Sequence, residues 1–237
     1  ANLKYLREIV SVNDKLAGEV VRIRQRGSFP LVLGGDHSIA IGTIAGLVRE
    51  RRKMGVIWFD AHGDLNTADP SPSGNIHGMS LAVSMGIGSP HLTNCGGNGA
   101  KISPHNVAII GARALDPGEK RVIRDRAITV FTMHEIDRLG MARVVNEALK
   151  VVTNGTDSVH LSFDLDVIDP NEAPGVGTPV PGGLTFREAH LALEMVAASQ
   201  VLTSAEFVEV NPILDERNKT AQLAVALIGS TFGERVL

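Results

Sequence analysis

Six short apolar runs alternate with longer segments of mixed polarity along the chain. The runs are rich in Val, Ile, Leu and Phe, as expected of buried strands, and they cover residues 29–33, 55–59, 106–111, 127–131, 158–166 and 201–210. The segments between them carry apolar residues near helical spacing and include residues 3–26, 38–53, 79–85, 133–139, 141–152, 184–198 and 218–233. This alternation predicts an α/β fold: an open parallel β-sheet with helices on both faces.

Composition limits the class of protein. A chain of 237 residues with 43% hydrophobic and 21% charged residues, and without a linker, fits a single domain over residues 1–237. The net charge of −3 gives no basic patch, so nucleic acid is not an expected partner. No apolar run has membrane-spanning length. Cys95 is the only cysteine, which suits a reducing compartment and predicts a cytoplasmic protein.

The first candidate site follows the apolar run 55–59. Asp60, His62 and Asp64 come within five residues of its end. Open α/β sheets place their sites at the carboxyl ends of strands, although Asp, His and Gly are also ordinary loop residues.

A second apolar run ends in the same way. Asp164 and Asp166 close the run 158–166, and residues i and i+2 of an extended strand point to one face. Clustered carboxylates need a positive partner. Salt bridges would supply one, yet neither acidic stretch has a Lys or Arg within three residues. A divalent cation, or a pair of them, is therefore predicted.

Two further strand ends carry candidate residues. The run 29–33 leads through two glycines to His37, and the run 201–210 contains Glu209. Considered by itself, His37 is best explained as a capping or packing residue. Because two acidic strand ends are predicted in the same sheet, we predict instead that it is a metal ligand. So many N and O ligands suit two ions that share bridging carboxylates, about 3.5–4 Å apart. Such ligands favour Mn(II) over copper or structural zinc, and the chemistry would be metal-assisted hydrolysis.

Other candidates lie in loops and at a helix start. The polar segment 64–78 supplies His77 as a proton carrier and three groups that could bind a polar ligand: Asn66, Ser73 and Asn75. A solvated loop explains this segment equally well. Asp116 and Glu119 open a helix, where acidic residues stabilise the macrodipole, so a structural and a functional role both remain open.

Three motifs resemble the signatures of the ureohydrolases: GGDHS at 34–38, DAHGD at 60–64 and SFDLDVIDP at 162–170. Within that family the chain resembles the bacterial arginases, on SGNIHGM at 73–79, DPGE at 116–119 and EVNP at 209–212. The resemblance implies the arginase/deacetylase-like fold. It also implies a binuclear manganese enzyme of arginine metabolism, in which a metal-bridging hydroxide converts L-arginine to L-ornithine and urea.

The resemblance also implies two Mn(II) ions per chain and their ligands. One ion would be held by His37, Asp60, Asp64 and Asp164. The other would be held by Asp60, His62, Asp164 and Asp166, so that Asp60 and Asp164 bridge the pair.

The same resemblance assigns roles at the substrate. His77 would carry the proton to the leaving amine, Asp64 would orient the hydroxide, and Glu209, supported by Thr178, would pair with the guanidinium. The α-carboxylate would be held by Asn66, Ser73 and Asn75. The α-amino group would be held by Asp116 and Glu119. A homo-oligomer, a trimer or a hexamer, is implied as well.

The chain departs from the arginase pattern in two places. Arginases begin earlier, with a strand and a helix ahead of the segment matching Leu3, so an N-terminally shortened chain lacking this first unit is expected. Val167 stands where arginases commonly have Gly, and only local backbone effects are expected there. Two alternatives remain: an agmatinase or other guanidino-substrate ureohydrolase, and a truncated metal-binding subunit with weak activity.

Overall fold

Six parallel strands lie side by side in one sheet, in the order β1-β6-β5-β2-β3-β4. The computed structural model describes residues 3–49, 53–67 and 73–234, and its strands are β1 (Leu31–Leu33), β2 (Met54–Phe59), β3 (Val107–Ala112), β4 (Thr129–Thr132), β5 (Ser158–Asp164) and β6 (Leu202–Val208). These are the six apolar runs, so the predicted parallel sheet is confirmed.

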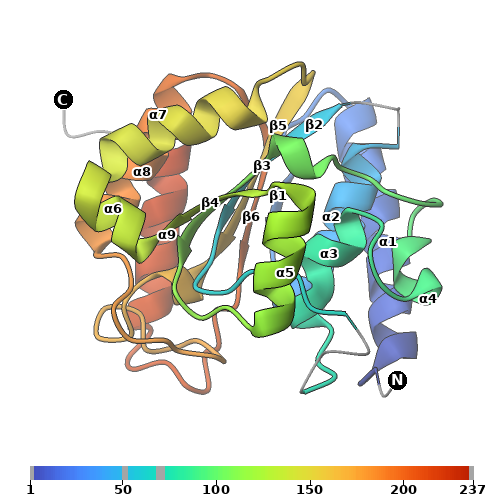
Figure 1. The fold of residues 1–237 in the computed structure, drawn as a ribbon, viewed down its shortest axis with the longest axis horizontal. Helices are drawn as coiled ribbons and strands as arrows, with labels where there is room; N and C mark the ends of the chain where they lie inside the picture. Colours follow the sequence, from blue (N-terminus) through green and yellow to red (C-terminus); the bar gives the residue numbers. More distant parts are fainter. Residues whose placement is uncertain (1–2, 50–52, 68–72, 235–237) are drawn as a thin grey trace.

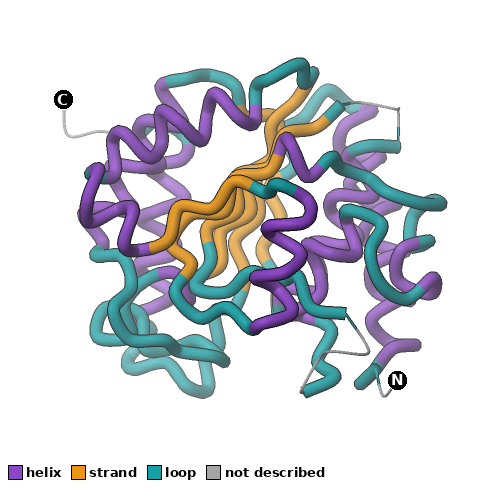
Figure 2. Tube along the Cα trace, in the orientation of Figure 1, coloured by secondary structure: helices purple, strands orange, loops and turns teal. Residues whose placement is uncertain are grey.

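Helices cover both faces of the sheet, which forms the middle of three layers (Figure 1, Figure 2). On one side lie α1 (Leu6–Gln25), α2 (Ala40–Leu47), α3 (Ser80–Ser84), α4 (Pro90–Thr93) and α5 (Pro117–Arg126). On the other side lie α6 (Met133–Leu139), α7 (Met141–Val152), α8 (Phe186–Ala198) and α9 (Lys219–Thr231). The sheet and its helices form a single α/β domain. Among the described residues, no helix is long and apolar enough to cross a membrane.

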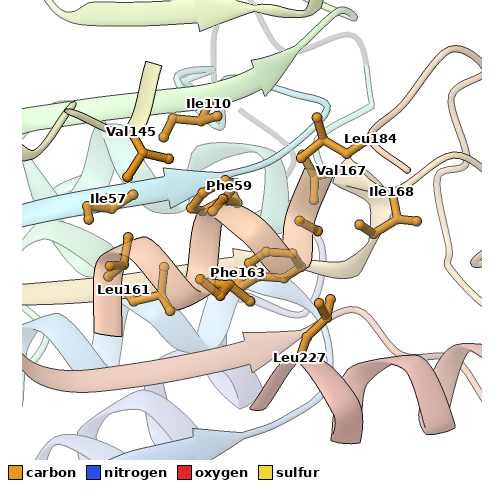
Figure 3. Close-up of a cluster of buried hydrophobic side chains, with 14 of the residues drawn as sticks. Ile57, Phe59, Ile110, Val145, Leu161, Phe163, Val167, Ile168, Leu184 and Leu227 are labelled. Carbon is orange, nitrogen blue, oxygen red and sulfur yellow. The ribbon is translucent and has the colours of Figure 1, made fainter. Parts of the chain in front are cut away.

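The central strands β2 and β5 fix the position of the site. Ile57, Phe59 and Phe163 are fully buried, and their side chains pack into the core shared with the α6–α9 layer (Figure 3). Phe59 pairs with Phe163 across the two strands. Because this register aligns the strand ends, Asp60 and Asp164 leave the sheet beside each other.

Two details of the predicted elements are wrong. The helix expected over 38–53 is shorter: a 3-10 turn at His37–Ile39 precedes α2, which ends at Leu47, and residues 50–52 lie outside the described residues. The strand expected to reach Asp166 ends at Asp164, because Leu165–Val167 forms a 3-10 turn. The Asp164 side chain accepts a hydrogen bond from the Asp166 backbone N–H and so stabilises that turn.

Candidate metal centre

The predicted ligands meet at one rim of the sheet. His37, Asp60 and Glu209 follow strands β1, β2 and β6, Asp164 is the last residue of β5, and all four side chains are buried. These four strands are neighbours in the sheet order β1-β6-β5-β2, and parallel strands deliver their carboxyl ends to the same edge. Residues separated by up to 172 positions are thereby brought together, as the hydrogen bond from the His37 backbone N–H to Glu209 demonstrates.

The first cluster surrounds the Nδ1 atom of His37. This nitrogen lies 3.1 Å from Asp164 Oδ2, 3.2 Å from Asp64 Oδ2 and 3.3 Å from Asp60 Oδ2. The ligand atoms of His37, Asp60 and Asp64 lie within 4.8 Å of one another, close enough to hold one metal ion.

The second cluster surrounds the Nδ1 atom of His62. It lies 3.0 Å from Asp166 Oδ2 and 3.3 Å from Asp60 Oδ1. Asp60 therefore presents one carboxylate oxygen to each cluster, and Asp60, His62 and Asp166 form a second group suited to a metal ion. Thr178 Oγ1 donates to Asp166 Oδ2 at 3.0 Å, so Thr178 lies beside this second cluster.

Burial and crowding control the protonation of these carboxylates. Burial raises the pKa of Asp64 well above its usual range, and the charge of Asp60 raises it further. The pKa of Asp164 is raised in the same way, by burial and then by Asp166. Asp60 is the exception. Burial opposes its ionisation, but hydrogen bonds with His37 and His62 lower its pKa below the usual range.

The two imidazoles hold protons in response to these charges. Burial alone would lower the pKa of His37, but the hydrogen bond to Asp60 and the charge of Asp64 outweigh burial and raise this pKa to about 9. Hydrogen bonds to Asp166 and Asp60 likewise overcome burial and raise the pKa of His62 to about 12. Without a cation, protons on these rings neutralise part of the negative charge.

The donor set fits divalent cations. Four carboxylates face only two imidazoles, so the two rings cannot balance the charge even when both are protonated. The nearby Arg113 guanidinium donates to backbone oxygens, including those of Asp166, Val167 and Val180. Hard oxygen donors with two imidazoles suit Mn, Mg or Zn ions.

A cavity of about 310 Å³ opens over the two clusters. Ten of the predicted site residues line it: His37, His62, Asp64, Asn66, His77, Asp116, Glu119, Asp164, Asp166 and Thr178. Gly78, Ala114 and Leu115 complete the lining. Asp60, Glu209, Ser73 and Asn75 are not part of the lining. The last two are joined by a hydrogen bond from the Asn75 N–H to Ser73 Oγ at 3.2 Å, next to residues outside the described part of the chain.

His77 and Glu209 form a pair beside the first cluster. His77 Nδ1 lies 3.3 Å from Glu209 Oε1, and the same oxygen accepts the His37 N–H at 2.7 Å. The hydrogen bond to Glu209 raises the pKa of His77. The His77 side chain is 25% exposed and lines the cavity, so it can hold a proton where a ligand would lie.

Asp116 and Glu119 have the structural role that the sequence left open, and they also face the cavity. They form the capping box of α5, which confirms the helix-start explanation, and they line the cavity. Asn66 Nδ2 donates to Asp116 Oδ2 at 2.9 Å, and Glu119 Oε1 accepts the Leu65 N–H at 3.1 Å. The helix start thus anchors the loop that leaves the first acidic strand end. Asn66 Oδ1 is buried without a hydrogen-bond partner.

Several supporting residues were not recognised from the sequence. Trp58 Nε1 donates to Asp60 Oδ2 at 2.9 Å and its ring stacks on His37, while Ser80 Oγ donates to Asp64 Oδ2 at 2.9 Å. Trp58 could have been found from its position, because it lies two residues before Asp60 on the same face of the strand. No sequence signal points to Ser80, which reaches Asp64 from a separate helix.

Comparison with known proteins identifies relatives over nearly the whole chain. A profile of the Arginase family matches residues 2–233. The arginase of Bacillus caldovelox is 61% identical over 237 residues, which is 100% of this chain and 79% of that protein. The crystal structure of arginase from Bacillus cereus superposes with a TM-score of 0.97 at 59% identity, covering 99% of this chain and 81% of the other. Entamoeba histolytica arginase, solved in complex with L-ornithine, superposes with a TM-score of 0.90 at 38% identity, over 97% of this chain and 78% of the other.

Proposed function

Because this chain belongs to the arginase family and is a hydrolase of that type, we propose that it cleaves the guanidinium group of L-arginine to give L-ornithine and urea, with two Mn(II) ions per chain. The observation that carries the proposal is the pair of ligand clusters joined by Asp60 at the base of a cavity. The bacterial type agrees with the Bacillus relatives.

The proposed metal ligands are the two clusters. His37, Asp60, Asp64 and Asp164 would hold one ion, and Asp60, His62, Asp164 and Asp166 would hold the other. Two divalent ions held by these residues would lower the pKa of a bound water and would so supply the nucleophile at neutral pH. Bridging by Asp60 is supported by its two oxygens, which face different imidazoles. Asp164 Oδ2 lies 3.1 Å from His37 Nδ1 while its Oδ1 accepts the Asp166 N–H at 2.7 Å, and this carboxylate would contribute to both sites.

The cavity supplies the groups that would bind and protonate the substrate. Asp64 and Glu209 would act on the reacting end, with Asp64 orienting the nucleophile and Glu209 binding the guanidinium. His77 would give its proton to the departing amine of ornithine; its raised pKa keeps the imidazole protonated for that step. Thr178 would support the reacting end through Asp166.

The opposite end of the cavity would hold the amino-acid part of arginine. Asp116 and Glu119 carry the negative charge that an α-amino group requires. Asn66, Ser73 and Asn75 would hold the α-carboxylate.

The test is urea release from L-arginine by protein loaded with manganese, with the metal counted per chain. Agmatine, which lacks the α-carboxylate, is the comparison substrate. The proposal expects L-arginine to be hydrolysed at least ~100-fold more efficiently than agmatine, since each lost charged contact costs about 1.5–3 kcal/mol. Preference for agmatine would favour the agmatinase alternative, and bound metal without urea release would favour a metal-binding subunit. A cytoplasmic location and assembly into a homo-oligomer, a trimer or a hexamer, belong to the same proposal.

A further inference from the structure

A chain of buried hydrogen bonds leads from His37 away from the cavity and into the sheet. The Nε2 atom of His37 lies 2.8 Å from Ser162 Oγ, which donates to Glu206 Oε1 at 2.7 Å. Ser162 and Glu206 are both fully buried. No step of the proposed reaction uses Glu206. Burying a carboxylate costs free energy unless the group is paired or hydrogen-bonded.

The direction of these hydrogen bonds follows from the chemistry of the groups. Hydrogen bonds with His160 and Ser162 overcome burial and lower the pKa of Glu206, so the side chain is a carboxylate and can only accept. The hydroxyl proton of Ser162 therefore points to Glu206, and its oxygen must accept from His37. His37 therefore donates to Ser162 through Nε2, which leaves Nδ1, the nitrogen that faces Asp60, Asp64 and Asp164, as the one that would bind a metal ion.

Neighbouring side chains hold the chain in place. Ser162 and Glu206 are paired residues of β5 and β6, and so are His160 and Ser204. His160 Nε2 lies 3.3 Å from Glu206 Oε1, and its Nδ1 lies 2.9 Å from Ser204 Oγ. The Trp58 ring stacks on His37 with centroids 4.1 Å apart and an interplanar angle of 8°. The imidazole is thus fixed in both its plane and its rotation.

We propose that Glu206, acting through Ser162, is a positioning residue for the first metal: it fixes the tautomer and orientation of His37 so that Nδ1 is ready to bind the ion. Carboxylates behind metal-binding histidines act in this way, and their loss costs roughly 10–100-fold in metal affinity. Here the carboxylate acts at one remove, through a hydroxyl. This inference rests on the proposed function only for the presence of two metals.

The test compares Mn(II) binding by metal-stripped wild type, Ser162→Ala, Glu206→Gln and the double variant, using equilibrium dialysis with free manganese read by electron paramagnetic resonance. We expect each single variant to weaken one of the two sites by roughly 10–100-fold and to leave the other unchanged. Because both residues act along one path, the double variant should lose no more Mn(II) affinity than the single variant with the larger loss. Ser158→Ala is the matched control, since Ser158 is buried on the same strand and its hydroxyl has no hydrogen-bond partner.

Three results would overturn the inference: unchanged binding in both single variants, equal weakening of the two sites, or losses that multiply in the double variant. The last would mean that Ser162 and Glu206 act independently. If Glu206→Gln does not fold, Ser162→Ala alone still tests the inference. If Ser162 were only structural, its loss would lower the melting temperature without weakening one metal site more than the other. Failure of the proposed function gives a different result, since wild type itself would then lack two manganese sites or urea release.

Discussion

The two oxygens of Asp164 make different contacts. Oδ2 lies 3.1 Å from His37 Nδ1, and Oδ1 accepts the backbone N–H of Asp166. The side chain therefore contributes to the first cluster and shapes the turn that carries Asp166 into the second. Asp60 differs because each of its oxygens faces an imidazole.

We predict that Asp164→Ala abolishes both metal binding and activity, because both clusters depend on this carboxylate. Metal should be counted by mass spectrometry after gel filtration, beside urea release. The matched control is Asp157→Ala at the opposite end of β5, which loses only an exposed hydrogen bond from the Lys53 N–H and should keep its metal. A normal metal count in Asp164→Ala would contradict the bridging role.

His77→Ala should separate catalysis from metal binding. The imidazole lines the cavity and contacts Glu209, but it belongs to neither ligand cluster. Loss of a general acid costs typically 100-fold or more, so we expect kcat to fall by at least ~100-fold while the manganese content stays that of wild type. Loss of metal together with activity would exclude the proton-shuttle role.

The six ligand candidates could be predicted because each either closes an apolar run or lies within five residues of the end of one. The groups that orient them could not. Ser80 reaches Asp64 from α3, and Glu206 reaches His37 only across the β5–β6 pairing. Such partners depend on strand order and register, which the sequence does not state.

Among the secondary-structure elements, the segment after β5 depends most on a single side chain. Arg113, just beyond β3, donates to the backbone oxygens of Asp166 at 2.8 Å, Val167 at 3.0 Å and Val180 at 2.7 Å. It therefore holds together both ends of an irregular loop that carries Asp166 and Thr178. Without Arg113 the Val167 oxygen would keep the Leu184 N–H at 2.9 Å, whereas the Asp166 and Val180 oxygens would lose the donors named here.

Arg113→Met should destabilise the fold and weaken the second metal site. Orphaned buried acceptors cost about 1–3 kcal/mol each, so we expect the free energy of unfolding to fall by about 3 kcal/mol, measured by urea denaturation. Arg113→Lys should recover only part, because an ammonium cannot reproduce the planar set of donors. Thr185→Ala, which breaks the capping box of α8, is the control: it should cost about 1 kcal/mol and leave metal binding unchanged. If Arg113→Met and Thr185→Ala lost metal equally, the role of Arg113 in holding the second metal site would be contradicted.

The strands could be predicted from the sequence, but one turn and one helix end could not. Every strand was found, because strands buried on both faces read as continuous apolar runs. The Leu165–Val167 turn was missed because its residues continue the apolar pattern of β5, and the turn forms through a side-chain to backbone hydrogen bond. The end of α2 at Leu47 was missed because apolar spacing alone does not mark where a helix stops.

At the scale of the whole molecule, the metal centre joins segments from His37 to Glu209 and concentrates buried charge at the rim of the sheet. Bound cations should therefore stabilise the entire fold. A ligand that binds only the folded state adds about 2.7 kcal/mol when present at 100 times its Kd. Metal-free protein must instead neutralise the site with protons, which ties its stability to pH.

We predict that metal-stripped protein loses stability as the pH rises from about 6.5 to about 9. The pKa of His37 is raised from 6.5 to about 9 on folding. The stability contributed by this proton is therefore complete below pH 6.5, and it is lost as the pH rises through the folded-state value. The slope is about 1.4 kcal/mol per pH unit for each proton that only the folded state retains. His62, whose pKa is raised to about 12, changes stability in the same direction.

The measurement is the melting temperature in a chelator across this pH range, repeated with saturating Mn(II). Manganese must displace the protons from Nδ1 of both imidazoles, so the loaded protein should melt at a higher temperature, and the advantage should grow as the pH rises. His37→Asn without metal should show a shallower decline than wild type, because one of the two protonated imidazoles is gone. A melting temperature of metal-free wild type that rises from pH 6.5 to 9 would mean that the site does not store protons in this way.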